Sequence, residues 1–442
     1  MEHETSPSVS LGNIKEHTER AGRTHATRWA SYLTVLRNAS TDHTYATPES
    51  FLALPSDIAL ERRVGEVINR IRTPKLRYIF LVGIGGSSVG AEAVVCAITG
   101  ASDAKRGTKY PKLITLDNPS SANFGSVSDI IQEELESAEE FAVVIESKSG
   151  TTIETIANAA ALLSVASRFE GYASRIVVVS DAGSPLARVA GSEGWSTLDI
   201  PKKVGGRYSI FSPAGLVVIG LMGIDISEFL RGAETGITEG LVASKKNVAI
   251  LLAASTLAMI QKKVSVIDAM YFSPQLFGVG LWYRQLFAES LGKKFSGKFR
   301  GATCPFPTVS IGTSDMHSIA QLVFGASRGI FTRLVSVDAT HRDVAISPHK
   351  ILEAAPAVAG LSLHGLQRVM RSGIARAYAS AKLPYIQLSI PSLSARTLGH
   401  LMAIHMIEIL LVARAVGVDA FTQPHVELYK KHVRAKMKKK SA

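Results

Sequence analysis

Short apolar runs in the first half of the chain each end in small polar residues, and this pattern constrains the fold most. Segments with a helical pattern, such as 89–98, separate the runs. Alternating strands and helices favour a parallel sheet with helices on both faces. Such sheets bind ligands beyond the carboxyl ends of their strands, where these polar residues would lie. The runs are Tyr78–Val82, Leu113–Leu116, Phe141–Ile145 and Ile176–Val179.

The second half repeats the pattern less regularly, with a long helix predicted at 363–382. A chain of 442 residues is long for a single core, so we expect two α/β domains. The strands predicted here are Val264–Ile267, Thr308–Ile311, Leu334–Val337 and Tyr385–Ile390. The expected organisation is a helical segment at 1–75, a first domain at 76–221, a junction at 222–245, a second domain at 246–429 and a basic tail at 430–442.

Composition indicates a folded protein of a reducing compartment. Hydrophobic residues make up 46% of the chain and charged residues 19%. The first ten residues lack the basic start and apolar core of a signal peptide. The most apolar stretch, 401–418, contains His405, Glu408 and Arg414, so it predicts a buried helix instead of a membrane span. Cys96 and Cys304 suggest no disulfide framework, and we expect a cytoplasmic protein.

The net charge of +12 arises largely at the C-terminal end. No acidic residue follows position 429. Such a charge run is typical of a solvated tail, and we find no nucleic-acid recognition motif beside it. We therefore expect neither a membrane nor a specific nucleic-acid partner. The basic residues of the tail are Lys430, Lys431, Arg434, Lys436, Lys438, Lys439 and Lys440.

The stretch VIESKSGTTIET at 144–155 places hydroxyl groups and one ammonium where a strand gives way to a helix. A helix start presents unpaired N–H groups and a partial positive charge, so it attracts anions. Gly150 lets the backbone approach a ligand closely. A helix cap alone would need only one such hydroxyl. We therefore predict a cradle for a phosphomonoester, formed by Ser147, Lys148, Ser149, Thr151 and Thr152.

A second glycine turn, GIGGSS, follows the first strand. Read as a dinucleotide fingerprint it is incomplete, because Ser88 stands where a third glycine or alanine is needed. Asp117 after the next strand would be the ribose ligand in that interpretation. Alternatively, Gly86 and Ser87 hold a sugar hydroxyl or phosphate at a helix start. Two phosphate-binding turns in one sheet suit one sugar phosphate that spans the strand ends.

Four further blocks make a resemblance specific. With GIGGSS and SKSGTT, and in this order, they resemble the glucose-6-phosphate isomerase (phosphoglucose isomerase) family in its compact bacterial form, from about residue 76 to 431. The resemblance implies two sugar-isomerase domains, each a doubly wound, mainly parallel sheet flanked by helices, in a homodimer. The blocks are GGRYSIFSPAGL at 205–216, RQLFAESLGKK at 284–294, TSDMHS at 313–318 and QPHVELYKK at 423–431.

The family interconverts glucose 6-phosphate and fructose 6-phosphate through a cis-enediol, without metal or cofactor. Carried over by motif, Glu289 is the base and Arg207 stabilises the enediolate. His317, which the family supplies from the other subunit, and Lys430 assist ring opening. The resemblance gives substrate contacts to Gln285, Gln423, Gly86, Ser87 and the phosphate cradle.

The last block departs from the family's D-Q-x-G-V-E pattern. Thr422 replaces the acid and His425 replaces the glycine. A histidine tolerates a positive φ only with strain, so these changes bear on where Lys430 lies. Only the motif distinguishes Lys430 from Lys431.

Three other interpretations remain. A related aldose–ketose isomerase, or one that also accepts mannose 6-phosphate, would use the same residues. A non-catalytic sugar-phosphate sensor would need only the cradle, and a dinucleotide-dependent oxidoreductase would use GIGGSS and Asp117. A metal site is not expected, because His400 and His405 are five residues apart and do not share a helix face.

Overall fold

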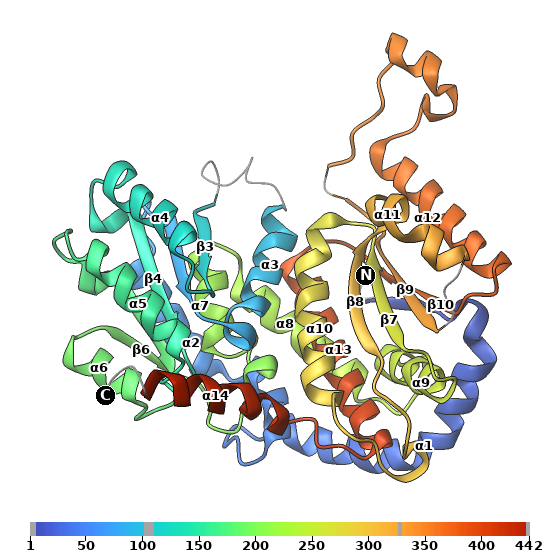
Figure 1. Cartoon of the computed structure of the whole chain (residues 1–442), viewed down its shortest axis with the longest axis horizontal. Helices are drawn as coiled ribbons and strands as arrows, with labels where there is room; N and C mark the ends of the chain where they lie inside the picture. The colour runs from blue at the N-terminus through green and yellow to red at the C-terminus, as the bar shows by residue number, and fades with distance from the viewer. Residues whose placement is uncertain (1–5, 101–109, 326–328, 341, 439–442) are drawn as a thin grey trace.

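The computed structural model describes residues 6–100, 110–325, 329–340 and 342–438, and contains two sheets with helices around each (Figure 1). The first sheet has the order β3-β2-β4-β5-β6, and all its pairings are parallel. Its strands are β2 (Tyr78–Val82), β3 (Lys112–Leu116), β4 (Phe141–Glu146), β5 (Ile176–Ser180) and β6 (Ser196–Asp199).

The second sheet has the order β1-β10-β9-β7-β8. It is parallel except for β1, which pairs antiparallel with β10 at one edge. Its strands are β1 (Ser8–Ser10), β7 (Val266–Tyr271), β8 (Phe306–Ile311), β9 (Ile330–Val337) and β10 (Tyr385–Ile390). The predicted class of two mainly parallel, helix-flanked sheets is confirmed.

Helices α3 and α10 pack against each other between the two sheets (Figure 1). Buried apolar side chains form one cluster from β2 through these helices to β7. The helices are α1 (Lys15–Ala39), α2 (Ile58–Ile71), α3 (Val89–Thr99), α4 (Ser121–Asp129), α5 (Ile153–Ala166), α6 (Pro185–Ser192), α7 (Pro213–Leu221), α8 (Ile226–Gly240), α9 (Val248–Gln261), α10 (Phe277–Leu291), α11 (Gly312–Gly325), α12 (Leu363–Ser380), α13 (Ala395–Val416) and α14 (Glu427–Lys438).

Some predicted strand boundaries were wrong. The strand expected from Val264 begins at Val266, because the chain turns after α9 and the Val264 N–H bonds to the Met259 carbonyl. The strands β1 and β6 were not predicted at all. The residues expected to form a junction contain α8, which packs along α13.

The apolar stretch 401–418 lies mostly within α13. By length and composition this helix is able to cross a membrane, but 94% of its most apolar window is buried inside the protein. His405 and Glu408 of α13 bond to each other, with 2.9 Å between Nδ1 and Oε2. The prediction of a buried helix is confirmed.

Candidate active site

The carboxyl ends of β4 and β5 hold the predicted phosphate cradle in place. The Ser147 N–H bonds to the Val179 carbonyl at 3.1 Å, and the Ser180 hydroxyl donates to the Ser147 carbonyl at 2.6 Å. Gly150 has a φ of +66°, and a Cβ there would lie 2.6 Å from the Ser184 hydroxyl oxygen. A glycine is therefore required by conformation and by space.

Hydroxyl groups gather where α5 begins. The Ser147 hydroxyl donates to Thr152 Oγ1 at 3.0 Å, and the hydroxyls of Ser149 and Thr151 are also 3.0 Å apart. Thr152 is the N-cap of α5, but its side chain makes no hydrogen bond to the first turn. The helix start therefore keeps donors for an anion.

The ammonium of Lys148 is engaged outside this group. Its Nζ lies 2.6 Å from Asp181 Oδ1 and donates to the Lys202 carbonyl at 2.9 Å. Asp181 therefore neutralises much of the positive charge that the sequence assigned to the cradle.

Gly86 joins the GIGGSS turn to the GGRYS block. A Cβ on Gly86 would lie 2.4 Å from the Gly206 carbonyl carbon and 2.6 Å from the Arg207 nitrogen. The two backbones are in contact, so no larger residue fits between them. Next to it, a Cβ on Gly85 would lie 3.2 Å from the Gln285 side-chain nitrogen, which brings α10 to the same turn.

Arg207 lies in the centre of the site and is 3% exposed. Its Nε donates to the Ser290 hydroxyl at 2.9 Å, and one terminal nitrogen donates to the Ala420 carbonyl at 2.6 Å. The other terminal nitrogen lies 3.1 Å from Glu289 Oε2 and also donates to Gln423. This single guanidinium joins three of the blocks recognised in the sequence, GGRYS, AESLGKK and QPHVELYKK.

Both carboxylate oxygens of Glu289 are held by neighbours. Oε2 is paired with Arg207, and Oε1 accepts a 3.0 Å hydrogen bond from Gln285, one helical turn earlier on α10. The Glu289 side chain remains 30% exposed. It lines a cavity of about 850 Å³ with Gly85, Asp117 and Gln285. An oriented, accessible carboxylate beside a fixed positive charge can move a proton and stabilise the anion that forms.

Comparison with known proteins identifies the family of the chain. A model of the phosphoglucose isomerase family matches residues 62–442. The chain belongs to this family. Proteins named glucose-6-phosphate isomerase from Parabacteroides distasonis and Rubrobacter xylanophilus are 30% and 31% identical to it, over 88% of this chain and 87% and 89% of theirs.

Solved structures share the fold. A hypothetical protein from Thermus thermophilus has a TM-score of 0.86 at 26% identity, over 97% of this chain and 99% of that one. A glucose-6-phosphate isomerase from Chlamydia trachomatis has a TM-score of 0.70 at 22% identity, over 87% and 75%. The family model and the curated relatives confirm the resemblance to the phosphoglucose isomerase family that was inferred from the six sequence blocks.

Two residues expected from the phosphoglucose isomerase family do not join the others within this chain. His317 is exposed on α11, and Lys430 lies on α14 with its Nζ 3.4 Å from Glu427. Neither makes a hydrogen bond or ion pair with Arg207 or Glu289 in the described parts of the chain. The start of the expected tail is thus helical, and its residues 439–442 lie outside the described residues.

The departures from the phosphoglucose isomerase pattern cause no backbone strain. His425 lies in the short 3₁₀ helix Pro424–Val426. Outside glycine, the described residues with positive φ are Tyr45, Lys263 and Lys382. Thr422 supplies a carbonyl to Arg207 at 3.3 Å, which any residue type can do.

Two titratable groups near the site were missed by the sequence analysis. Lys293 donates to the carbonyls of Glu289 and Ser290, and burial together with the Arg207 charge lowers its pKa to about 8. The only feature of the sequence that pointed to Lys293 was its position within the AESLGKK block. Glu146, the last residue of β4, is 1% exposed, and neither of its oxygens has a hydrogen-bond partner. Glu146 could have been noticed because it is an acidic residue at the end of an otherwise apolar run.

Glu146 should make the fold less stable at alkaline pH. Burial, and then the charge of Glu92, raise the pKa of Glu146 well above its usual value. The folded state therefore holds a proton that the unfolded chain releases above about pH 4.3. Between these two pKa values, stability falls as pH rises, by at most about 1.4 kcal/mol per pH unit.

Replacement of Glu146 by glutamine should remove this loss. Thermal unfolding at pH 6, 7 and 8 should show the advantage of Glu146→Gln over the parent protein growing with pH. The same change at Glu170, an exposed carboxylate, should have no such effect. An advantage independent of pH would contradict a protonated Glu146.

Proposed function

We propose that this protein interconverts glucose 6-phosphate and fructose 6-phosphate through a cis-enediol(ate), with Glu289 as the base. The observation that carries the proposal is the contact of Glu289 with buried Arg207, 3.1 Å apart, at a cavity beside the predicted phosphate cradle. The names of the curated relatives supply the substrates. The activity belongs to glycolysis and gluconeogenesis in the cytoplasm.

In this mechanism the cradle at the start of α5 binds the phosphate, and Glu289 moves the proton between C2 and C1. Gln285 keeps the Glu289 carboxylate oriented through its 3.0 Å hydrogen bond. Arg207 stabilises negative charge on the enediolate, because its guanidinium is fixed by Ser290 and Ala420 before substrate binds. Gly86, Ser87 and Gln423 contact the sugar. No step requires a metal ion or a cofactor.

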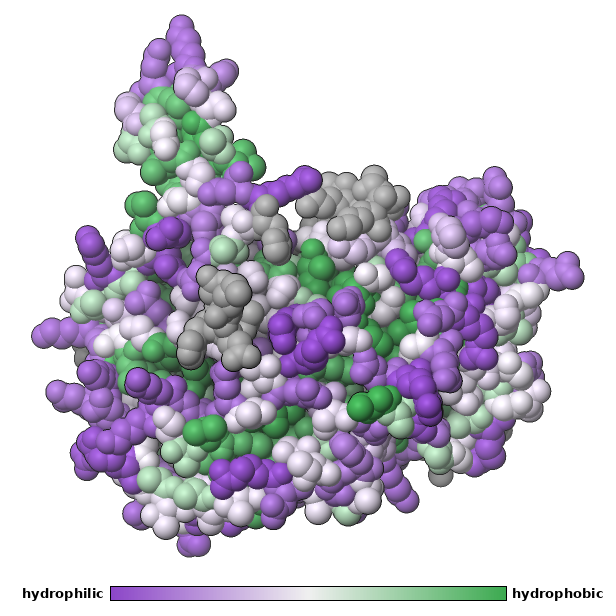
Figure 2. Space-filling view, turned by 180° about the vertical axis from the view of Figure 1, so that it is seen from behind, coloured by the Kyte–Doolittle hydropathy of each residue, from purple (hydrophilic) through white to green (hydrophobic). Residues whose placement is uncertain are grey.

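Ring opening is assigned to Lys430 and to His317 of the partner subunit. His317 is exposed on α11, and among the described residues it makes no hydrogen bond or ion pair with Arg207 or Glu289. Beside α11, the segment from 342 into α12 projects from the body of the protein (Figures 1 and 2). Ile351 is 71% exposed there, and Val369 is 59% exposed. Exposed apolar side chains on a projecting segment are typical of a surface that another chain covers, which supports a homodimer.

The proposal is tested by an assay of both directions of the reaction, with a chelator present and no cofactor added to the isomerase. We expect conversion of both sugar phosphates, and mannose 6-phosphate in the same assay measures how strictly C2 is recognised. Binding of 6-phosphogluconate without conversion of any substrate would instead identify a sensor.

Ser149→Ala should raise KM for fructose 6-phosphate about tenfold and leave kcat nearly unchanged. The reason is the loss of one hydrogen bond to a charged phosphate, which is worth about 1.5 kcal/mol or more. The matched control is Ser164→Ala, an exposed serine farther along α5. A fall in kcat without a change in KM would place the phosphate elsewhere.

A further inference from the structure

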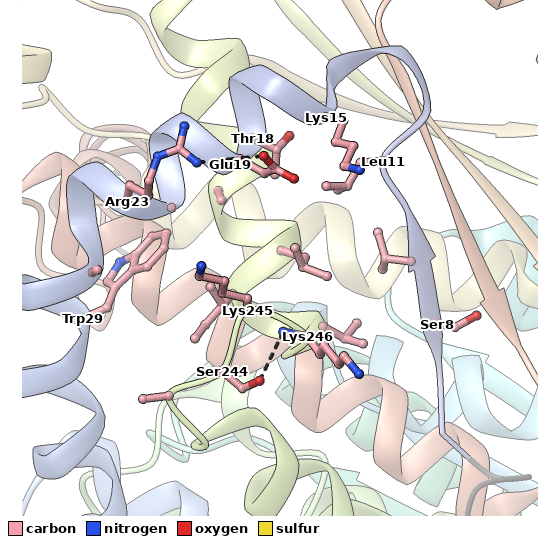
Figure 3. Close-up of a pocket in the computed structure, with 18 of the residues that line it drawn as sticks. Ser8, Leu11, Lys15, Thr18, Glu19, Arg23, Trp29, Ser244, Lys245 and Lys246 are labelled. Atoms are coloured by element: carbon pink, nitrogen blue, oxygen red, sulfur yellow. Dashed lines mark hydrogen bonds and ion pairs between the residues drawn. The ribbon is translucent and has the colours of Figure 1, made fainter.

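A second cavity, of about 910 Å³, lies between β1, α1 and the segment that leads into α9 (Figure 3). None of the active-site residues described above lines it. Its volume is within the range of sites that hold small molecules. The proposed isomerisation does not use this cavity.

The inner wall of the cavity is apolar. Val9, Leu11, Ile250 and Leu251 line it, and these four side chains are partly exposed. Trp29 also lines the cavity but is almost fully buried, and its N–H donates to the Leu411 carbonyl at 2.9 Å. A hydrocarbon body would be stabilised here by leaving water.

The rim of the cavity is positively charged. Lys15, Lys245 and Lys246 line it, as the close-up shows (Figure 3). In the described part of the chain, none of their ammonium groups makes an ion pair or hydrogen bond. The one acid that lines the cavity, Glu19, lies 3.8 Å from Arg23, which compensates its charge.

The start of α9 adds to this charge. The helix begins at Val248, shortly after Lys245 and Lys246, and Val248 also lines the cavity. The positive end of the helix dipole therefore lies beside the two ammonium groups. An apolar wall and an unpaired cationic rim are complementary to a molecule with a hydrocarbon body and one negative charge.

We propose that this cavity binds an amphiphilic carboxylate, with its hydrocarbon body against Leu11, Ile250 and Leu251 and its carboxylate beside Lys245 and Lys246. The apolar wall excludes a ligand that is polar throughout, such as a sugar phosphate. The rim excludes a cationic amphiphile, because three uncompensated ammonium groups would repel it.

The test is calorimetric titration of the full-length protein with dodecanoate below its micelle-forming concentration. We expect saturable binding with a negative heat-capacity change, because apolar surface is buried. Dodecanol should bind at least about tenfold more weakly, since it lacks the charge. Dodecyltrimethylammonium should not bind.

Variants locate the site. Lys245→Glu combined with Lys246→Glu should weaken dodecanoate binding at least about tenfold and leave dodecanol binding and isomerase activity unchanged. Lys262→Glu, at the other end of α9, is the matched charge control and should have no effect. Ala30→Phe, at an exposed position on the cavity rim, should fill the space and weaken both ligands.

Three results would overturn the proposal: no saturable dodecanoate binding, equal binding of the cationic amphiphile, or full dodecanoate affinity in the double lysine variant. These binding results do not depend on isomerase activity, so they test the cavity separately from the proposed function.

Discussion

Glu289→Gln is expected to lower kcat for the conversion of fructose 6-phosphate by about 10²–10⁴-fold, the usual contribution of a positioned acid–base group. KM should change little, because glutamine keeps the shape of the side chain. Arg207 should also stay in place, since Ser290 and the Ala420 carbonyl still hold it. Parallel measurement of kcat and of 6-phosphogluconate affinity checks both statements.

The matched control is Glu193→Gln, an exposed carboxylate outside the site, which should keep full activity. A Glu289→Gln protein that loses 6-phosphogluconate affinity as well as activity would indicate that Glu289 serves to build the site. Unchanged kcat would show that another group is the base.

The same variant tests whether two subunits share one site. Mixing inactive Glu289→Gln and His317→Ala proteins under exchange conditions should restore roughly a quarter of the parent activity, because about half of the dimers are then hybrids with one intact site. If His317 acts within its own chain, mixing will restore nothing, and a His317→Ala protein that is active by itself would show that His317 plays no part.

Glu408→Gln is expected to destabilise the second sheet and its helices strongly. Glu408 is fully buried, and its Oε1 lies 2.6 Å from a terminal nitrogen of Arg333, which is 1% exposed. The terminal nitrogens of Arg333 also donate to the hydroxyls of Tyr283 and Thr256, at 2.7 Å and 2.6 Å. Loss of the carboxylate leaves a buried, uncompensated guanidinium, at a cost of about 3–5 kcal/mol.

A double-mutant cycle isolates this pair. The urea midpoint of Glu408→Leu combined with Arg333→Met should lie closer to the parent value than that of either single variant, since no unpaired charge remains. If the loss of stability in the double variant equals the sum of the losses in the two single variants, the two side chains act independently.

The ion pair of Glu408 with Arg333 should also make the stability of the fold decrease at low pH. Burial opposes ionisation of Glu408, but the charge of Arg333 and the hydrogen bond from His405 outweigh it and lower its pKa to about 2. The pKa of Glu408 in the folded state lies below the unfolded value of about 4.3. The stabilisation that ionised Glu408 gives the fold is therefore fully present above about pH 4.3 and is lost as the pH falls toward 2. Glu408→Gln should lack this part of the acid transition.

Sequence patterns predicted the strands that are buried on both faces, because continuous apolar runs such as Tyr78–Val82 and Phe141–Ile145 are distinctive. They did not predict β1, whose sequence Ser-Val-Ser has no apolar run and forms a strand only because β10 offers an edge. The start of β7 was placed too early, because Val264 is apolar but belongs to the turn after α9.

Only the part of the site that consists of motif side chains was predictable from the sequence. Motifs gave Arg207, Glu289, Gln285 and Gln423, which the fold brings into contact. The Ala420 carbonyl that holds Arg207 carries no sequence signal, since any residue supplies a carbonyl. The pairing of Lys148 with Asp181 joins two different strand ends, and only the order of the strands in the sheet reveals it.

The pairing of β1 with β10 has a consequence for how the chain is made. Trp29 near the start bonds to the Leu411 carbonyl, 382 residues later. At about 5–20 residues per second, a ribosome needs roughly 20 to 75 seconds to synthesise that interval. During this time β1 has no strand to pair with and the part of α1 that packs on α13 is uncovered, whereas α9 and the segment Pro48–Ser56, which also pack on α1, are made earlier. The nascent chain therefore exposes part of roughly its first 40 residues until α13 and β10 are made.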